Sequence, residues 1–522
     1  MRVLRGITNW TLLAVLPFLL LGGCAFWSDD GPPRGEGAVG GAVGGAGGGG
    51  TARPAVVASP KVADTIAENA RPGTPDWRLR KRGQADEIEG YADRVSVFPG
   101  ESFQLFVSTT TKGFKAEAFR VGWYGGAHAR KLWESPRQPG VRQAYPKVSN
   151  QNYTVTAPWK PSLTVTTTDW PEGVYLLRLT ADSGAQRYVP MTLRSRDTAG
   201  RLVILNATTT WQAYNMWGGH NLYNGPSGYS DRSRAVSFDR PYDKDGTGKF
   251  MGYEHPAIVL AEKTGKQLAY ATDNDLHASP DLLEGARGLV TLGHDEYWST
   301  NMRANVTKAR DSGVNVAFLG ANAVNRHIRF SPTKLGPDRL VTCYKDSSED
   351  PVAKSNPKES THDWRLPPVA RPESDLIGIM YNCFPAAGSF TVHRPGSWLF
   401  RGTGARKGTA FPGLIGPETD AINPIGPTPR PIEVLAHSPI DCGGIAKTAD
   451  ATYYTTKSGS GVVATGTMRW VCAMRGPKCG HGVTEAGRRF VTKATENLLL
   501  AMAAGPLGTT YPVKDNLREF TS

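Results

Sequence analysis

Three short stretches of this 522-residue sequence carry side chains that could hold a hard metal ion or move protons. The first contains two tyrosines, Tyr214 and Tyr223. The second contains a histidine and a glutamate two positions apart, His294 and Glu296, and the third ends at Asn322. Phenols and carboxylates are oxygen ligands, which suit Fe(III) better than zinc or copper(I). The stretches therefore predict a polar site with metal or acid–base chemistry.

Several known catalytic signatures are missing from the sequence. The His-x-Glu pair is similar to part of the zinc deaminase motif, but the Pro-Cys-x-x-Cys partner is absent. There is no His-Glu-x-x-His, no Gly-x-Ser-x-Gly and no P-loop, and no cysteine lies in the three stretches. The sequence therefore leaves phenols, carboxylates, a histidine and an amide as the reactive groups.

Each of the three stretches directly follows an apolar run that could be a strand. The runs at 202–205, 288–292 and 314–319 are nearly continuous, as in parallel strands covered on both faces. Ligands of open α/β sheets bind outside the carboxyl ends of such strands. We therefore expect the three stretches to meet at one edge of a sheet.

Helices are expected between these strands, which together predict a doubly wound α/β arrangement. Ser299 is placed to cap a helix at 300–312 and Gly313 to end it. Beyond residue 331, Pro/Gly-rich connections with isolated strands are expected. The other expected elements are helices at 256–263 and 488–504 and strands at 267–271 and 461–465.

The region from 77 to 193 predicts a different architecture, an antiparallel β-sandwich of about 120 residues. Apolar and polar residues alternate in short runs, and turn signals such as Pro99-Gly100 separate them. Its tryptophans could line a carbohydrate platform, but we expect them to pack in the core. They are Trp123, Trp133, Trp159 and Trp170.

The N-terminus has the features of a bacterial lipoprotein signal. Two early arginines precede an apolar run that is too short to span a bilayer and contains Pro17. The run ends in Leu21-Gly22-Gly23-Cys24, which resembles a lipobox. We expect residues 1–23 to be removed, Cys24 to carry lipid outside the cytoplasm, and the Gly/Ala/Pro-rich stretch 24–60 to act as a flexible tether. The alternative is an ordinary cleaved signal that happens to contain a cysteine.

The net charge bears on the partners of the protein, and the cysteine content bears on its disulfides. The formal net charge is +13, but the basic residues are scattered, so no nucleic-acid partner is expected. Five cysteines remain besides Cys24. Cys472 and Cys479 could close a small disulfide loop, and one thiol should stay free.

At the three stretches the sequence resembles the N,N-dimethylformamidase large (β) subunit family. The motifs Trp-Gln-Ala-Tyr-Asn, Ser-Phe-Asp-Arg-Pro-Tyr, Thr-Asp-Asn-Asp-Leu, Gly-His-Asp-Glu-Tyr-Trp-Ser and Leu-Gly-Ala-Asn follow in the family's order. The family's enzyme is a mononuclear iron amidohydrolase with two tyrosines and one glutamate as ligands. The resemblance implies one Fe(III) per chain, held by Tyr214, Tyr223 and Glu296, with Tyr242 or Tyr253 as alternatives for the second tyrosine.

The resemblance also implies roles for three further residues. His294 and Asn322 match substrate-facing positions next to the metal, and Glu418 in Gly-Pro-Glu-Thr-Asp resembles a further catalytic carboxylate. For the fold it implies an immunoglobulin-like β-sandwich at 61–197. A glutamine-amidotransferase-like α/β catalytic domain with β-rich C-terminal extensions is implied at 198–512.

The expected function is hydrolysis of the C–N bond of an unidentified amide, in which metal-bound water acts as hydroxide. The alternative is a non-catalytic surface lipoprotein that binds cell envelope or carbohydrate. The expected partners are a membrane, through the lipid on Cys24, and a small amide substrate. An envelope glycan held by the sandwich and a homo-oligomer remain open.

Overall fold

The structure is a computed structural model that describes residues 64–423 and 426–520. The signal at 1–23, Cys24 and the tether at 24–60 lie outside these residues. The described residues all belong to one compact unit, and the division at residue 198 stays a prediction. The described residues form a mixed α and β structure, rich in sheet, with 23% helix and 33% strand. No helix in the described part is both long and apolar enough to cross a bilayer.

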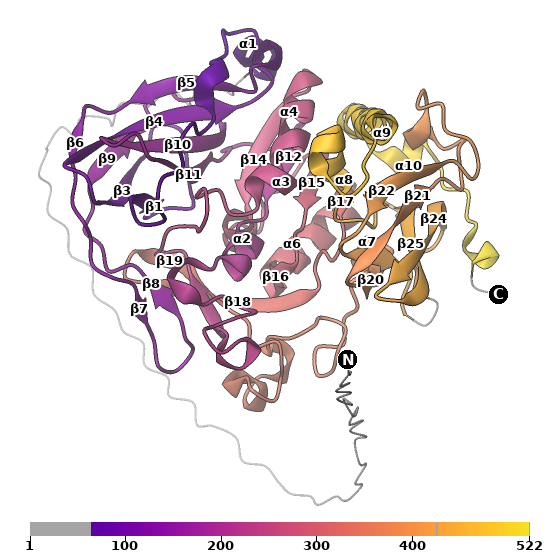
Figure 1. The fold of residues 1–522 in the computed structure, drawn as a ribbon. Coiled ribbons are helices and arrows are strands. Elements are labelled where there is room, and N and C mark those ends of the chain that lie inside the picture. Colours follow the sequence, from indigo (N-terminus) through magenta and orange to yellow (C-terminus); the bar gives the residue numbers. More distant parts are fainter. Residues whose placement is uncertain (1–63, 424–425, 521–522) are drawn as a thin grey trace, which may run out of the picture. The chain divides into compact units, whose positions relative to one another are not determined.

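A nine-stranded sheet forms the centre of the unit, and its first five strands are parallel (Figure 1). The five strand predictions are confirmed to within two residues at each end, because nearly every strand residue is apolar and buried on both faces. In spatial order these strands are β14 (Leu268–Thr272), β12 (Leu202–Asn206), β15 (Gly288–Gly293), β17 (Asn315–Gly320) and β26 (Gly461–Ala464).

The C-terminal strands extend this sheet, so the prediction of isolated strands beyond residue 331 is wrong. A long antiparallel hairpin pairs directly with β26, which carries the sheet four strands further. These strands are β25 (Ile445–Thr455), β24 (Ile432–Cys442), β21 (Ala386–Thr391) and β22 (Ala410–Ile415). Two further sheets are smaller. One has four strands, in the order β13 (Ala235–Ser237), β19 (Gly336–Thr342), β18 (Arg326–Thr333) and β16 (Tyr297–Ser299). The other has two strands, β20 (Met380–Cys383) and β23 (Thr419–Ala421).

Helices pack on both faces of the parallel strands. Alternate residues of β12 belong to different cores, Leu202 and Ile204 to one and Val203 and Leu205 to the other. The first core includes α4 (His255–Lys263), α8 (Trp470–Ala473) and α9 (Glu485–Ala504), and the second includes α5 (Asp273–Ala278) and α6 (Thr300–Asp311). The Ser299 cap is confirmed, since its side chain accepts a hydrogen bond from the Met302 amide.

Two sheets precede this region and enclose one apolar core, and all their strand pairs are antiparallel except β2 with β11. Phe103 and Leu105 from one sheet pack with Ala116 and Leu177 from the other. The first sheet is β1 (Ile88–Ala92), β3 (Ser102–Thr109) and β9 (Leu163–Thr166). The second is β2 (Ser96–Val97), β11 (Gln186–Leu193), β10 (Gly173–Ala181), β4 (Gly113–Val121) and β5 (Ala129–Glu134), with β6 (Gln138–Pro139) paired to β4.

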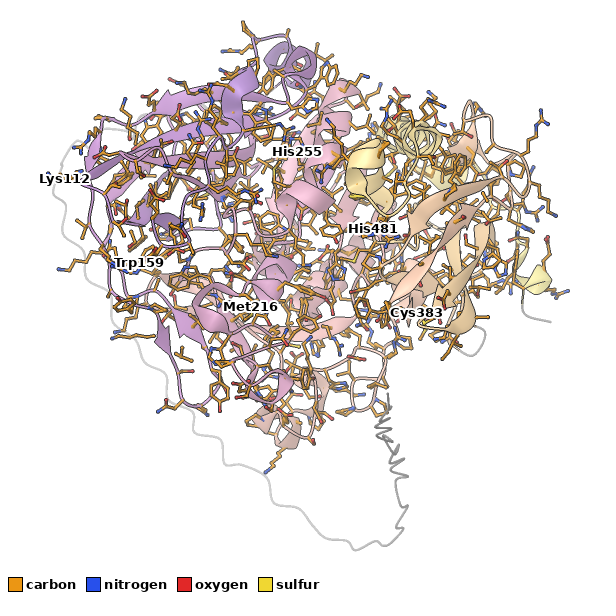
Figure 2. All side chains as sticks on the ribbon, in the orientation of Figure 1. Lys112, Trp159, Met216, His255, Cys383 and His481 are labelled. Atoms are coloured by element: carbon orange, nitrogen blue, oxygen red, sulfur yellow. A yellow bond between two sulfur atoms is a disulfide. The ribbon has the colours of Figure 1, made fainter. Side chains whose placement is uncertain are left out.

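The tryptophans of this region pack inside it, as predicted. Trp159 and Trp170 are buried, while Trp123 and Trp133 are partly buried against the apolar cores. Figure 2 shows Trp159 among the dense side chains of the N-terminal sheets. An immunoglobulin-like sandwich stays a prediction.

Two disulfides form within the described residues. The predicted pair Cys472–Cys479 is confirmed, and a second bond joins Cys383 at the end of β20 to Cys442 at the end of β24. Cys343 is buried and free, so the single free thiol is also confirmed.

Candidate active site

The carboxyl ends of β12, β15 and β17 bring the predicted side chains together. β12 leads into α2 (Thr208–Tyr214), a short helix that ends at Tyr214. β15 ends in Gly293, and the Glu296 amide then donates to Thr210 Oγ1 of α2 at 2.9 Å. This hydrogen bond joins the two strand ends and fixes Glu296 beside the helix that carries the tyrosine.

A glycine lets the ends of β15 and β17 approach closely. Gly293 and Gly320 face each other in the parallel register. A Cβ atom on Gly320 would lie 1.9 Å from the Gly293 carbonyl oxygen, so no other residue fits there without moving the backbone. The stretch after Gly320 therefore lies directly beside His294, whose Nδ1 is 3.4 Å from the Ala321 oxygen.

Two phenols and one carboxylate form the centre of the site. Tyr214 Oη donates to Glu296 Oε2 at 2.8 Å, and Tyr223 Oη lies 2.8 and 2.9 Å from the two Glu296 oxygens. The two phenol oxygens are themselves 2.8 Å apart. The three residues predicted as metal ligands thus make one closed set of contacts. Met216, labelled in Figure 2, marks the segment between the two tyrosines.

The structure also distinguishes the alternatives for the second tyrosine. Tyr242 packs edge-on against Trp211 and has no contact with Glu296 among the described residues. The Tyr253 ring lies 6.5 Å from the His294 ring, on the side of the histidine rather than at the carboxylate. Tyr223 is therefore the alternative that contacts both Tyr214 and Glu296.

The other predicted residues are His294, Glu418 and Asn322, and of these His294 contacts the tyrosine–glutamate centre directly. His294 Nε2 lies 3.1 Å from both Tyr214 Oη and Glu296 Oε2, and its Nδ1 is 3.8 Å from Glu418 Oε2. Asn322 Nδ2 donates to the same Glu418 oxygen at 2.7 Å. The backbone of Asn322 has a positive φ of 56°, a conformation that asparagine tolerates well. His294, Asn322 and Glu418 are thus connected to the tyrosines through the histidine.

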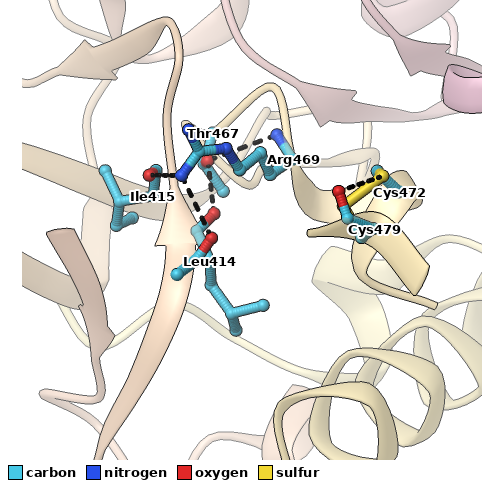
Figure 3. The surroundings of a disulfide bond; sticks show 7 residues. Leu414, Ile415, Thr467, Arg469, Cys472 and Cys479 are labelled. Atoms are coloured by element: carbon cyan, nitrogen blue, oxygen red, sulfur yellow. Dashed lines mark hydrogen bonds between the residues drawn. A yellow bond between two sulfur atoms is a disulfide. The ribbon is translucent and has the colours of Figure 1, made fainter. Parts of the chain in front are cut away.

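Glu418 comes from a distant part of the chain, and a compact set of contacts positions it. Thr467 Oγ1 donates to the Leu414 oxygen at 2.7 Å and accepts from the Gly416 amide at 3.1 Å. Arg469 Nη1 donates to the Ile415 oxygen at 2.8 Å, as Figure 3 shows beside the Cys472–Cys479 disulfide. The strand that leads to Glu418 is therefore held by the segment that follows β26.

Four residues of the site were not predicted as ligands or catalytic groups. Tyr297 Oη donates to Tyr223 Oη at 2.7 Å, and Lys345 Nζ donates to Tyr297 Oη at 2.6 Å. Arg326 Nε lies 3.4 Å from Glu296 Oε1. Lys249 Nζ lies 3.7 Å from the centre of the Tyr214 ring. Tyr297 directly follows Glu296 in the sequence, but no local pattern indicated the three cations.

The electrostatics of the centre favour an ionised carboxylate between neutral phenols. Burial would raise the pKa of Glu296, but His294, Lys345 and Arg326 outweigh it and hold that pKa far below its usual range. Burial and the Glu296 charge raise the pKa of both Tyr214 and Tyr223 well above 10. The phenols therefore lose their protons only if a strong positive charge arrives between them.

His294 has the opposite tendency to a typical buried histidine. Burial would lower its pKa, but the Glu418 and Glu296 carboxylates outweigh this and raise it. The imidazole therefore holds a proton more firmly than an isolated histidine. It could donate that proton to a group that gains negative charge.

The donor set fits a small, hard, highly charged cation. In an octahedral site with oxygen ligands at about 2.0 Å, neighbouring ligand oxygens are about 2.8 Å apart. The three oxygens here are separated by 2.8 to 2.9 Å. Among the described residues no three His, Cys, Asp or Glu side chains gather as a metal site, so a metal here would depend on the phenols.

The residues of the site differ in their exposure to solvent. Glu296 and His294 are 1% and 2% exposed. Tyr214, Tyr223 and Lys249 each keep partial exposure. The tyrosines and Lys249 are therefore more accessible to a small molecule than the carboxylate is.

Fold and site together define a mixed α/β protein with an oxygen-rich site at the carboxyl ends of parallel strands. The family described as N,N-dimethylformamidase beta subunit-like, C-terminal, matches residues 115–483, so the chain belongs to this family. No curated protein matches the chain. The resemblance seen in the sequence is thereby confirmed.

The chain is also similar to a solved structure of a Paenibacillus sp. cycloisomaltooligosaccharide glucanotransferase in complex with cycloisomaltoheptaose. The identity is 8% and the TM-score 0.15, over 51% of this chain and 35% of that chain. The matched part is about a third of that enzyme's length. A likeness this weak carries no argument about fold or function.

Proposed function

We propose that the chain is an iron-dependent amidohydrolase that holds one Fe(III) between Tyr214, Tyr223 and Glu296. The observation that carries the proposal is the mutual contact of two phenols and one carboxylate, in which Tyr214 Oη, Tyr223 Oη and Glu296 Oε2 are 2.8 to 2.9 Å apart. Membership in the dimethylformamidase-like family supports an amide substrate. Two phenolates and a carboxylate would together offset a charge of 3+, which favours this ion over a divalent one.

When bound, such an ion supplies Lewis-acid chemistry, since it polarises an amide carbonyl and makes water acidic. The surrounding residues of the chain hold and orient the groups that would bind the ion. Lys345, through Tyr297, and Arg326 place hydrogen bonds and positive charge around Tyr223 and Glu296. These contacts fix the carboxylate and the phenol before any substrate arrives.

The leaving amine must gain a proton, and His294 is placed to supply it. Its Nε2 faces Tyr214 and Glu296 at 3.1 Å, and its Nδ1 faces the Glu418 carboxylate at 3.8 Å. A proton held on the imidazole can move toward the amine nitrogen as the C–N bond breaks. Glu418 would then stabilise the charged imidazole and, with Asn322, orient it.

Metal analysis and a visible absorption spectrum of the purified chain test the proposal. We expect one iron per chain and a visible band from phenolate-to-Fe(III) charge transfer. We also expect proton release when iron is added to chelator-treated protein, because both phenols must ionise. Colourless protein that holds zinc or no metal, yet folds and binds envelope material, would instead support the non-catalytic binding module.

We propose a finer architecture to accompany this function. An immunoglobulin-like β-sandwich would occupy 61–197, and a doubly wound, glutamine-amidotransferase-like α/β domain would occupy 198–512. The shared core of the two N-terminal sheets and the helices on both faces of the parallel strands support this division. An envelope glycan could bind the sandwich, and an oligomer is compatible with the proposal.

We propose that the protein is anchored to a bacterial membrane, outside the cytoplasm, by lipid on Cys24. The lipobox-like Leu-Gly-Gly-Cys and the tether after it support this location. Cys24→Ala should release the protein from the membrane fraction or leave its signal uncleaved. Fractionation and labelling with a radioactive fatty acid measure this. Undiminished lipid labelling of Cys24→Ala would count against the anchor.

A further inference from the structure

Lys249 differs from the other cations of the site because its ammonium group is unpaired. Lys345 Nζ donates to Tyr297 Oη, and Arg326 is bonded to Glu296 and Asp363. In the part of the chain that the structure describes, Lys249 Nζ has no hydrogen-bond or ion-pair partner. Its contacts are the rings of Tyr214 and Tyr253, at 3.7 and 5.5 Å from their centres. Its three N–H donors therefore remain available.

The loop that carries Lys249 is packed tightly against its surroundings. Gly246 has a positive φ of 86°, and a Cβ there would lie 2.0 Å from the Tyr188 oxygen. The Tyr188 amide in turn donates to the Asp245 oxygen at 2.9 Å. The loop is thus held against β11, and α3 (Phe250–Tyr253) begins directly after Lys249. The ammonium is consequently placed by the fold rather than by a free surface loop.

Lys249 lies beside the partly exposed Tyr214 of the candidate metal centre. The Tyr214 and Tyr223 rings stack with their centres 4.5 Å apart, so Lys249 must lie over the other face of Tyr214. Tyr214 and Lys249 both keep partial exposure, whereas Glu296 is 1% exposed. A molecule that places an amide at the phenol oxygens can therefore bring a neighbouring group to the ammonium.

The carboxylates around Lys249 are already engaged by other groups. Glu296 accepts hydrogen bonds from both tyrosines, and Glu418 accepts one from Asn322 at 2.7 Å. Neither lies within ion-pair distance of Lys249. The partly exposed ammonium of Lys249 therefore keeps hydrogen-bond donors that an anionic group from outside the chain could accept.

We propose that Lys249 is a specificity-determining residue that binds a carboxylate of the substrate, so the substrate class is small amides that carry a carboxylate near the amide bond. This proposal rests on the proposed amidohydrolase function for the reaction at the neighbouring tyrosines. One unpaired ammonium matches a single carboxylate better than a phosphate, whose three oxygens usually require several donors.

Calorimetric binding to the full-length chain tests this assignment with matched pairs of acid and neutral amide. N-acetylglycine and N-acetylglycinamide place the charge on the amine side, and succinamate and succinamide place it on the acyl side. We expect at least one acid to bind about 10-fold or more tightly than its neutral partner, as a charge-assisted hydrogen bond provides. Lys249→Met should remove that preference, and Lys249→Arg should restore most of it.

Two controls separate this role from a structural one. Lys244→Met changes an exposed lysine on the same loop and should leave the affinities for acid and neutral amide unchanged. Circular dichroism checks that Lys249→Met is folded. If it is not folded, Lys249→Arg is titrated in its place, and it should keep most of the preference for the acid. Equal affinities for acid and amide in the parent, no measurable binding of either acid, or an equal loss of both affinities in Lys249→Met would each overturn the proposal.

The outcome is separable from that of the proposed function. Repeating the titrations on chelator-treated protein measures the carboxylate contact without iron and without turnover. A Lys249-dependent preference in protein that, as purified, contains no iron and hydrolyses no amide would keep the carboxylate site and reject the iron amidohydrolase. A coloured, iron-containing protein without the preference would do the reverse.

Discussion

Asp295 and Glu296 are adjacent in the sequence and are both buried, yet the pKa values of their carboxyl groups are shifted in opposite directions. Burial would raise the pKa of Glu296, but His294, Lys345 and Arg326 keep it very low. Burial also acts on Asp295, and there it raises the pKa to about 7 against one hydrogen bond from Trp298. The difference comes from the neighbouring groups and not from the degree of burial.

Successive side chains of an extended segment point to opposite sides, which separates the two carboxylates. Glu296 reaches the two phenols, whereas Asp295 acts on Asp273, whose pKa is raised by burial and by the Asp295 charge. One oxygen of each aspartate has no hydrogen-bond partner among the described residues. Glu296 therefore has the ionised, well-oriented carboxylate that a metal ligand requires, and Asp295 does not.

Replacement of Glu296 and of Asp295 should give the largest difference, which is expected in iron affinity. Glu296→Gln keeps the size of the side chain but removes the charge that offsets the ion, so iron affinity should fall by more than the roughly 10- to 100-fold typical of outer contacts. Asp295→Asn should keep iron and the visible band. Metal analysis after dialysis measures both variants.

The opposite result would identify another ligand. If Glu296→Gln holds iron as fully as the parent and keeps the same spectrum, the carboxylate ligand has been misassigned. Tyr297, Asp295 and Glu254 would then be tested, with Tyr297 first because its hydroxyl already contacts Tyr223.

A second contrast concerns the two tyrosines that the sequence left as alternatives. Tyr223→Phe should lower iron content severalfold and shift the visible band, because one of two phenolates is lost. Tyr242→Phe removes a hydroxyl that does not contact Glu296 and should leave iron and spectrum unchanged. Identical spectra for Tyr223→Phe and the parent would exclude Tyr223 as a ligand.

The central part of the fold and site followed from local sequence patterns. The runs at β12, β15 and β17 are apolar on both faces, so their carboxyl ends could be located, and with them Tyr214, His294, Glu296 and Asn322. α2 was not expected as a helix, since Thr208-Thr-Thr favours other conformations. The tertiary contacts of Thr209 with Asp273 hold this segment in place.

The residues that the sequence did not reveal come from long-range packing. Lys345 follows the β18–β19 hairpin and Lys249 follows a loop, and neither belongs to a periodic pattern. Glu418 was suggested by the family resemblance alone, because its position depends on Thr467 and Arg469 about 50 residues further along. The C-terminal strands were missed as sheet members for the same reason, since the pairing of β25 with β26 that joins them to the sheet has no local signal.

A smaller effect is expected at Asn322, which contacts Glu418 but no predicted ligand. Asn322→Gly removes the side chain and tolerates the positive φ of 56°, so it should keep iron while amide turnover falls about 10- to 100-fold. Asn322→Ala should show the same loss together with lower thermal stability, because alanine is strained at that φ. Iron content, turnover and melting temperature are measured together, and unchanged turnover in Asn322→Gly would assign the residue a purely structural role.

The last contrast concerns the pH dependence of stability and uses the Asp295 side of the comparison. The pKa of Asp295 is raised from an ordinary 3.8 to about 7, so the folded protein keeps a proton that the unfolded chain releases. The folded state then binds more protons, and the free energy of unfolding falls as pH rises, by up to about 1.4 kcal/mol per pH unit between about pH 4 and pH 7. Asp295→Asn has no such proton, so its stability should rise relative to the parent across this window and stay parallel above it. Urea unfolding of both proteins at several pH values measures the difference. Parallel curves throughout would mean that Asp295 is ionised in the folded protein, and the contrast with Glu296 would then have to rest on the phenol contacts alone.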